Sequence, residues 1–445
     1  MHFIYSALLA SALVLSAPWW LFQMLRSGKY RAGLGERLGK IPHRIRTGAP
    51  CIWVHAVSVG EVLAVSNLFL GIRQHFSEHP VFISTTTAAG QKLARQRFGE
   101  ESVFYFPLDL SVAIRPWFRQ LRPRLVVLAE TEFWPNFLSY CKRHGAQIAI
   151  VNARISDRSL PGYRRFRPLL RRILQDVDLF LAQCDEDRHR LQEIGAPEER
   201  VKVSGNLKFD AMAPAAASPL VSALRHAIER GGAAPVLVCG STMEGEERLL
   251  LEAFKALLQQ HLRALLVLAP RHPERFEQIA ALLAASGLPN WRRSRWSTDE
   301  SSFLPGGVFL LDSIGELASI YALADLAFVG GSLVPRGGHN ILEPAQHGVP
   351  ILVGPHTENF RDMVSIFHRA GALRVVSPAK LLPAILNLLA NPAQRQDLGR
   401  RAAEVARAHS GATERTLAAL ELLLQEDAGS KFALREQAAE AAHKR

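Results

Sequence analysis

Short apolar runs alternate with segments of helical periodicity along most of the chain. In the first half, the runs that predict buried strands cover residues 51–57, 81–84, 125–129, 148–151 and 179–182. Each run is followed by a segment in which apolar residues recur with the period of an amphipathic helix. Such alternation is typical of parallel sheets built from strand–helix–strand units, and it predicts an α/β domain over residues 47–212.

The same rhythm stops near the middle of the chain and then starts again. Residues 210–219 read DAMAPAAASP, a composition that is typical of linkers, and we place the linker at 213–219. Strand-like runs return at residues 236–239, 265–269, 308–311, 326–329 and 351–353. We therefore expect two Rossmann-like domains that face each other across a cleft. The second covers 220–391 and is followed by a C-terminal helical segment over 392–445.

The N-terminal segment follows neither pattern. Residues 1–25 contain no Lys, Arg, Asp or Glu, and because a membrane span needs roughly 20 mostly apolar residues, they predict a membrane-anchor helix. Residues 26–46 form a basic juxtamembrane segment with seven Lys or Arg and one Glu, which favours a cytoplasmic location for the domains that follow. Two alternatives stay open. One is a cleaved signal, although positive charge before the apolar run is absent; the other is a helix in the membrane plane, which Pro18 would permit.

Composition adds a preference for anionic partners. The 445 residues are 48% hydrophobic and 21% charged, as expected for globular domains, and carry a formal net charge of +12. Residues 154–172 contain seven arginines and one acidic residue, and they form either a solvated surface or a contact for an anionic membrane or phosphorylated lipid. No nucleic-acid-binding module is recognisable, which argues against a nucleic-acid partner. The four cysteines form no CxxC pair, so we expect reduced core thiols and no metal site.

Candidate binding residues of the second half follow its predicted strands, where open parallel sheets bind their ligands. Glycines at these positions would let backbone approach a ligand, and a helix that starts near Asn340 would present free N–H groups to an anion. Arg271 suits a phosphate, and Glu343 suits the hydroxyls of a ribose. Singly, these features are ordinary turns and a helix N-cap; together they predict nucleotide binding. Neither a GxGxxG nor a Walker A motif is present, which disfavours NAD binding and ATP hydrolysis.

Ionisable residues follow the strands of the first half as well. Glu61 and Ser58 form an S-x-x-E pattern after the first strand, which is either a helix-capping box or a general base at the start of a helix. Glu130 follows the third strand, on a short turn that also carries Glu132. Lys208 lies just before the linker, either as a point charge that faces the reactants or as a plain surface lysine.

Six blocks of sequence together resemble the 3-deoxy-D-manno-octulosonic acid (Kdo) transferases, a family of GT-B glycosyltransferases. The blocks are HAVSVGE at 55–61, ETEFWPN at 130–136, NAR at 152–154, GNLKFD at 205–210, PRHPER at 270–275 and GGHNILEP at 337–344. The resemblance implies the GT-B fold and an inverting transfer that needs no metal and no cofactor. The implied donor is CMP-Kdo, and the implied acceptor is the phosphorylated lipid A precursor (lipid IVA) at the cytoplasmic face of the cell inner membrane.

The same resemblance implies roles for individual residues. Glu61 would be the proton acceptor, and Glu130 and Lys208 would support the transition state. The residues implied for CMP binding are Pro270, Arg271, Ile314, Gly315, Glu316, Asn340, Ile341, Leu342 and Glu343.

Two other functions stay open. One is a GT-B transferase that uses a UDP-sugar for another lipid or for a cell-wall acceptor. The other is a membrane-tethered nucleotide-binding protein without catalysis, in which Glu61 would be only a helix cap.

Overall fold

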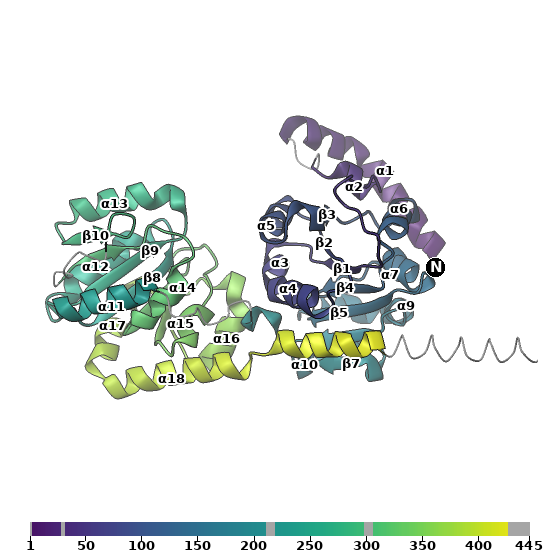
Figure 1. Ribbon diagram of the computed structural model, residues 1–445. Helices are drawn as coiled ribbons and strands as arrows, with labels where there is room; N and C mark the ends of the chain where they lie inside the picture. The colour runs from purple at the N-terminus through teal and green to yellow at the C-terminus, as the bar shows by residue number, and fades with distance from the viewer. Residues whose placement is uncertain (1, 28–31, 211–218, 298–305, 426–445) are drawn as a thin grey trace, which may run out of the picture. The chain divides into compact units, whose positions relative to one another are not determined.

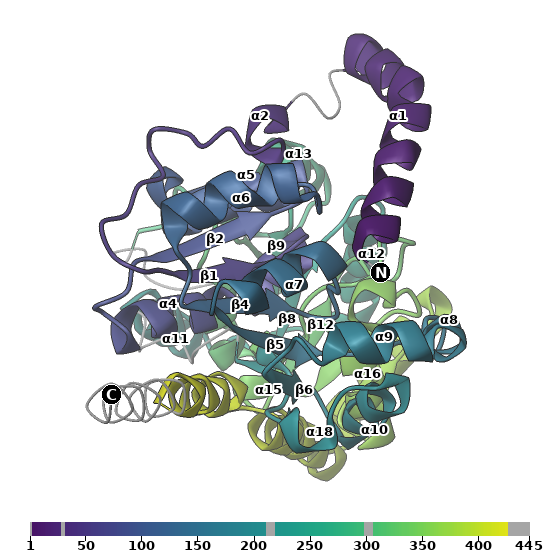
Figure 2. The ribbon, with the colours of Figure 1, turned by 90° about the vertical axis from the view of Figure 1, so that its right-hand side faces the viewer.

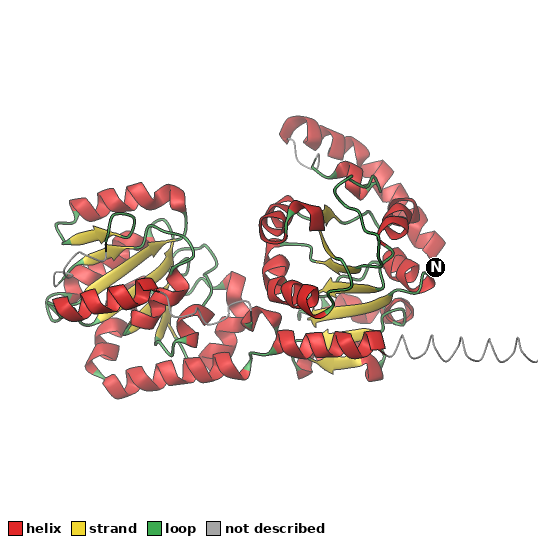
Figure 3. Ribbon diagram, viewed as in Figure 1, coloured by secondary structure: helices red, strands yellow, loops and turns green. Residues whose placement is uncertain are grey.

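The computed structural model describes residues 2–27, 32–210, 219–297 and 306–425. Contacts divide the chain into two compact units, a first unit of Met1–Ala211 with Ser410–Arg445 and a second unit of Met212–His409. Residues 213–218 of the predicted linker and 426–445 of the predicted C-terminal segment lie outside the described residues. Each unit is built around a parallel sheet flanked by helices, which confirms the predicted α/β class (Figures 1 and 3).

The first unit contains a seven-stranded parallel sheet in the order β3-β2-β1-β4-β5-β6-β7. Its strands are β1 (Ile52–His55), β2 (Val81–Thr85), β3 (Val103–Tyr105), β4 (Leu125–Ala129), β5 (Gln147–Ala153), β6 (Leu179–Ala182) and β7 (Val201–Val203). The chain builds outward in one direction from β1 and in the other from β4. The boundary between these two strands is therefore the topological switch point, where open α/β sheets bind their ligands.

Helices cover both faces of this sheet (Figure 1). They are α2 (Leu34–Arg37), α3 (Val59–Ala64), α4 (Ser66–His75), α5 (Ala88–Phe98), α6 (Ser111–Leu121), α7 (Pro135–Arg143), α8 (Leu160–Arg165), α9 (Arg167–Leu174) and α10 (Asp185–Ile194). In β1, Ile52 and Val54 enter the core under α3, α4 and α5, whereas Trp53 enters the core under α6 and α7, because successive strand residues point to opposite faces. Residues 412–425 form a further helix, whose Leu420 and Leu424 complete the core that contains Ile52.

The second unit repeats this plan with the order β10-β11-β9-β8-β12-β13-β14, again all parallel. Its strands are β8 (Val236–Thr242), β9 (Leu265–Pro270), β10 (Asn290–Arg292), β11 (Val308–Leu310), β12 (Leu326–Val329), β13 (Ile351–Val353) and β14 (Arg374–Val375). Its helices are α11 (Pro219–Gly231), α12 (Glu246–Leu257), α13 (Phe276–Ala285), α14 (Leu317–Ile320), α15 (Leu342–Gln346), α16 (Arg361–Arg369), α17 (Leu381–Ala390) and α18 (Pro392–Ala408). The switch point of this sheet lies between β8 and β12.

Four short strands escape prediction from the hydrophobic pattern, namely β3, β7, β10 and β14. All four are edge strands of their sheets. An edge strand has one neighbour and needs fewer buried side chains, as Lys202 and Val203 of β7 show by their exposure. Three of the four, β7, β10 and β14, therefore carry a weaker apolar signal than the central strands, all of which the pattern predicts, whereas β3 is short but fully buried.

The N-terminal segment forms a single helix, α1 (His2–Ser27), with Pro18 inside it. The helix contacts α7, where Asn136 Nδ2 donates to Ser6 Oγ at 2.9 Å (Figure 2). Leu8 and Leu15 of α1 are exposed. In the part of the chain that the structure describes, no helix combines the length and the apolarity that crossing a membrane requires. The predicted membrane anchor stays a prediction.

The cysteines occupy two kinds of environment. Cys51, Cys141 and Cys239 are buried free thiols, as expected. Cys184 is also free but exposed, so the expectation of a core position is wrong for this residue. Among the described residues, no group of His, Cys, Asp and Glu side chains is arranged to hold a metal ion.

Candidate functional site

Glu61 lies on the first turn of α3, just after the carboxyl end of β1. Ser58 caps this helix: its Oγ accepts from Glu61 N at 3.5 Å and donates to Glu61 Oε1 at 2.9 Å. Val57 N donates to Glu61 Oε2 at 2.7 Å. Ser58 therefore caps the helix, and Glu61 reaches back to Val57 N, one residue before the N-cap donor of a standard capping box. These contacts occupy only two of the roughly four lone-pair sites of a carboxylate. The remaining lone pairs leave Glu61 able to accept a proton.

The surroundings of Glu61 make its carboxyl more basic. The side chain is only 8% exposed, and this burial is the main reason that its pKa is raised. The negative charge of Glu130 raises the pKa further. Hydrogen bonds from Val57 N and Ser58 and the positive charge of Lys208 act in the opposite direction. Glu61, Glu130 and Lys208, predicted separately from the sequence, thus belong to one electrostatic cluster.

Glu130 and Lys208 form an ion pair beside Glu61, with Lys208 Nζ 3.1 Å from Glu130 Oε1. Glu130 directly follows β4 and has a left-handed backbone with φ of 58°. Lys208 lies in a 3₁₀ turn (Leu207–Phe209), and Leu207 N donates to Oδ1 of Asn152 at 3.0 Å. Asn152 is buried and is also left-handed, with φ of 55°. Asparagine tolerates this conformation, whereas a left-handed glutamate is uncommon, and such strain is concentrated at functional sites.

Glu132 joins this cluster, although the sequence alone assigns it no role. Burial raises its pKa to about 7, and the negative charges of Glu61 and Glu130 contribute. The one feature of the sequence that could have pointed to Glu132 is its place beside Glu130 on the turn after β4. Its protonation depends on burial, which the sequence does not report.

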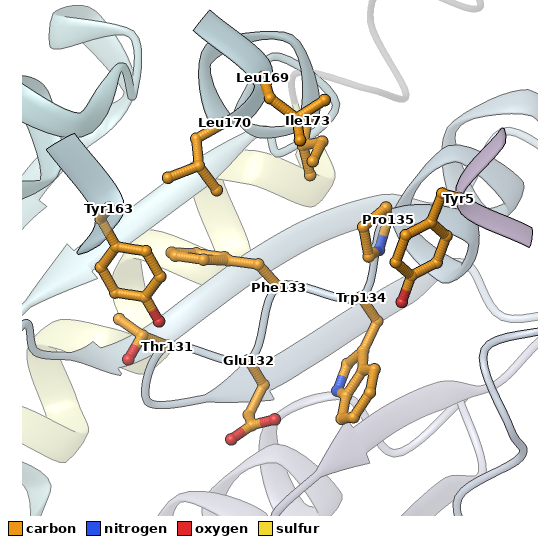
Figure 4. Close-up of a pocket in the computed structure, with 10 residues that line it drawn as sticks. All are labelled: Tyr5, Thr131, Glu132, Phe133, Trp134, Pro135, Tyr163, Leu169, Leu170 and Ile173. Atoms are coloured by element: carbon orange, nitrogen blue, oxygen red, sulfur yellow. The ribbon is translucent and has the colours of Figure 1, made fainter. Parts of the chain in front are cut away.

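A cavity of about 420 Å³ lies next to this cluster (Figure 4). Its wall includes Thr131 and Glu132, the two residues that follow Glu130, together with Phe133 and Trp134. Most of the wall is apolar, so the same turn borders a charged cluster and an apolar hollow.

In the second unit, a cluster forms after β9 and β12. Arg271 follows β9, and its N–H donates to Thr242 O at 3.0 Å. Burial raises the pKa of Glu343 to about 7, opposed by Arg271 and by a hydrogen bond from Asn340. Burial also lowers the pKa of His339 to about 4, with a contribution from Arg271. The positive charge of Arg271 therefore lowers the pKa of both Glu343 and His339, so the three side chains form one electrostatic cluster. The sequence analysis missed His339, although it lies in the GGHNILEP block.

The other residues implied for CMP binding have different environments. Pro270 ends β9, whereas Ile341 and Leu342 are buried at the start of α15, which begins at Leu342, close to the predicted start near Asn340. Ile314 is exposed on the turn after β11.

Gly315 and Glu316 complete this turn. Gly315 has a left-handed backbone, with φ of 88°. The Glu316 carboxylate is held by Arg293, with Nη2–Oε1 at 2.9 Å and Nε–Oε2 at 3.0 Å, and by the Ser313 hydroxyl. A ligand at this turn would thus meet backbone and an already paired carboxylate.

Comparison with known proteins places both units in one family. The family model described as 3-deoxy-D-manno-octulosonic-acid transferase (kdotransferase) matches residues 32–211. A protein of Bordetella pertussis named 3-deoxy-D-manno-octulosonic acid transferase is 38% identical over 417 residues, which is 90% of this chain and 95% of the relative. A protein of Haemophilus influenzae with the same name is 34% identical over 405 residues, 90% of this chain and 93% of the relative.

Solved structures are similar in fold. A UDP-N-acetylglucosamine 2-epimerase from Listeria monocytogenes, described as putative in its structure's name, covers 85% of this chain and 98% of its own, at 14% identity and a TM-score of 0.53. A glycosyltransferase from Rickettsia africae covers 85% and 99%, at 12% identity and a TM-score of 0.50. The C-terminal CMP-Kdo binding domain of WaaA from Acinetobacter baumannii is 33% identical, covers 42% of this chain and 96% of its own, and has a TM-score of 0.38.

Proposed function

Because the chain belongs to the family of Kdo transferases and is therefore a glycosyltransferase, we propose that it transfers Kdo from CMP-Kdo to the phosphorylated, acylated lipid A precursor in lipopolysaccharide biosynthesis. The observation that carries this proposal is the 38% identity to the Bordetella transferase, because the match extends over 95% of that protein and includes both units of this chain.

Glu61 is the general base of the proposed reaction. The acceptor hydroxyl gives its proton to the Glu61 carboxylate while its oxygen bonds to the anomeric carbon of Kdo. The bond from that carbon to the phosphate oxygen of CMP breaks, CMP leaves with the electron pair, and the configuration at the carbon inverts. The raised pKa of Glu61 supports this role, because a more basic carboxylate takes up the proton more readily. Lys208, paired with Glu130, supplies positive charge that opposes negative charge developing in the transition state.

CMP binding is assigned to the second unit. The guanidinium of Arg271 suits the phosphate, and the carboxyl of Glu343 suits the ribose hydroxyls. The electrostatic coupling of these two side chains supports a shared ligand. Pro270, Ile314, Gly315, Glu316, Asn340, Ile341 and Leu342 complete the proposed site. No metal and no cofactor enter this scheme.

We place the protein at the cytoplasmic face of the cell inner membrane, attached through α1. Leu8 and Leu15 of α1 expose apolar surface, and Phe166 is exposed between the exposed Arg165 and Arg167 at the junction of α8 and α9. Apolar and cationic side chains in such combination bind anionic lipid surfaces. Deletion of residues 1–25 should release the protein from inner-membrane vesicles. Retention of the truncated protein on the vesicles would contradict attachment through α1.

The decisive experiment combines the purified protein, CMP-Kdo and the lipid A precursor, with the products identified by mass. The proposal predicts a product heavier than the precursor by whole Kdo units. Calorimetric titration should show binding of CMP in preference to UDP. Absence of transfer, or a clear preference for UDP, would overturn the proposed function.

A further inference from the structure

The cavity beside the carboxylate cluster is formed by three parts of the first unit that are distant in sequence. It is lined by Tyr5 of α1, by residues 131–135, by Tyr163 of α8 and by three apolar residues of α9. Figure 4 shows the Phe133 side chain at its centre, with Leu170 above it and Tyr5 beside Pro135. The cavity is thus bounded by α1, by the arginine-rich helices α8 and α9, and by residues 130–135, the turn that carries Glu130 of the proposed site.

The wall suits an apolar ligand. The rings of Phe133 and Tyr163 meet edge to face, with centroids 6.0 Å apart. Leu170 and Ile173 contribute aliphatic surface that belongs to the unit's core, whereas Leu169 is 44% exposed. A concave apolar surface with a few polar groups at one side is typical of small-ligand sites.

Two polar side chains of the cavity, those of Glu132 and Thr131, lie on the turn after β4, and Tyr5 and Tyr163 contribute the other hydroxyls. Glu132 and Thr131 immediately follow Glu130, which is paired with Lys208. A pKa of about 7 leaves the Glu132 carboxyl neutral for much of the time at neutral pH, so an apolar group beside it is less costly than one beside a permanent charge. A ligand that fills the cavity therefore has its polar end directed toward the proposed catalytic residues.

The helices that form the opposite side carry cations. Arg164, Arg165, Arg167, Arg171 and Arg172 are exposed on α8 and α9. Arg164 pairs with Glu193, its Nη2 lying 2.8 Å from Glu193 Oε2. The apolar cavity therefore lies between the proposed catalytic cluster, Glu61 with the Glu130–Lys208 pair, and an arginine-rich surface. This arrangement is complementary to an amphiphile whose acyl chain fills the cavity, whose sugar hydroxyl meets the cluster and whose phosphates meet the arginines.

We propose that this cavity binds one acyl chain of the lipid acceptor, and that it thereby positions the acceptor sugar next to Glu61 and the Glu130–Lys208 pair. The inference rests on the proposed function, because it names a subsite for the acceptor of that reaction. Burial of each methylene group should strengthen acceptor binding by about fourfold. Acyl length should therefore affect kcat/KM strongly until the cavity is filled.

The test compares a long-chain with a short-chain acceptor of the same phosphorylated disaccharide, below the concentrations at which either forms micelles. Leu169→Glu places a charge in the cavity wall at a half-exposed position that tolerates it. Leu70→Glu on α4, where the leucine is 46% exposed, is the matched control. We expect Leu169→Glu to lower kcat/KM for the long-chain acceptor at least tenfold, to leave that for the short-chain acceptor within twofold, and Leu70→Glu to change neither.

The outcomes separate this inference from the function on which it rests. Equal kcat/KM for long and short chains in the unaltered protein, or an equal loss for both acceptors in Leu169→Glu, would overturn the acyl subsite while Kdo transfer stands. Failure of the unaltered protein to transfer Kdo to either acceptor would overturn the proposed function itself. Turnover of the short-chain acceptor shows that the variant is folded.

Discussion

Each unit places a buried glutamate at the start of the helix that follows its first strand, Glu61 after β1 and Glu246 after β8. Glu246 is fully buried, and its carboxylate accepts from four backbone N–H groups, those of Met243 and residues 331–333, at 2.6–3.0 Å. Gly331, with φ of 70°, lets the backbone after β12 turn these N–H groups toward the carboxylate. Glu246 therefore joins two neighbouring strand ends at the switch point of the second sheet.

Glu61 occupies the corresponding place in the first unit with a different set of neighbours. Its carboxylate has one backbone donor and one hydroxyl donor, and it is coupled to Glu130 and Lys208. Burial raises the pKa of both glutamates, so a raised pKa alone does not mark a base. The difference lies in the lone pairs: Glu246 has its acceptor sites filled by the protein, and Glu61 keeps some for a substrate.

The largest effect should come from removal of the Glu61 carboxylate. Glu61→Ala should lower kcat by about 10²–10⁴-fold, the usual contribution of a general base, and leave CMP affinity unchanged. Steady-state kinetics and calorimetry measure these quantities. Ser58→Ala is the control, because it should remove about 1 kcal/mol of capping energy and retain the base. Near-normal turnover by Glu61→Ala would reduce Glu61 to a helix cap.

Glu246→Ala should instead lower stability and leave turnover nearly unchanged. Loss of the carboxylate leaves several backbone donors without their partner, and we expect a loss of about 3 kcal/mol in the free energy of unfolding of the second unit. Turnover per folded molecule should change little. Denaturant titration of the intact chain measures the loss, with the exposed Glu252→Ala on the same helix as control, for which we expect less than about 0.5 kcal/mol. Equal stability of the two variants would refute the structural role of Glu246.

Lys208→Ala should have an intermediate effect on catalysis. Removal of one positive group that acts on the transition state should lower kcat by about a hundredfold. Lys208→Arg should recover part of the rate, because it keeps the charge near Glu130 but changes its geometry. Lys202→Ala, which removes an exposed lysine of β7, provides the comparison. If Lys208→Ala behaves like Lys202→Ala, Lys208 is a plain surface residue.

The smallest effect concerns the pH dependence. The rate should fall as the pH decreases through the raised pKa of Glu61, because protonation removes the base. The negative charge of Glu130 raises the pKa of Glu61, so Glu130→Gln should move the acidic limb of kcat/KM to lower pH by less than about one unit. Glu198→Gln, at an exposed position of the same unit, should not move it. A shift toward higher pH would contradict the coupling.

The central strands and the residues that follow them could be predicted because both depend on local sequence. The strand β4 and the position of Glu130 just after it follow from five consecutive apolar residues, LVVLA. The pairings of the site could not be predicted in this way. Arg293 binds Glu316, and Lys208 binds Glu130 from 78 residues away, and no local pattern specifies either partner.

The sequence by itself determined two α/β units, an apolar N-terminal helix and the strand ends at which chemistry is concentrated, because hydrophobic period and turn composition act over a few residues. Only the tertiary structure decided that residues 412–425 complete the core that contains Ile52, and that the four edge strands join the sheets. It alone also placed an apolar cavity beside the turn that begins at Glu130. The tertiary structure also decided that Glu246 accepts hydrogen bonds from four backbone N–H groups, whereas Glu61 keeps lone pairs that can take a proton. These outcomes depend on burial and on contacts between residues far apart in the chain, which set both the pKa of a carboxyl and the number of donors that reach it.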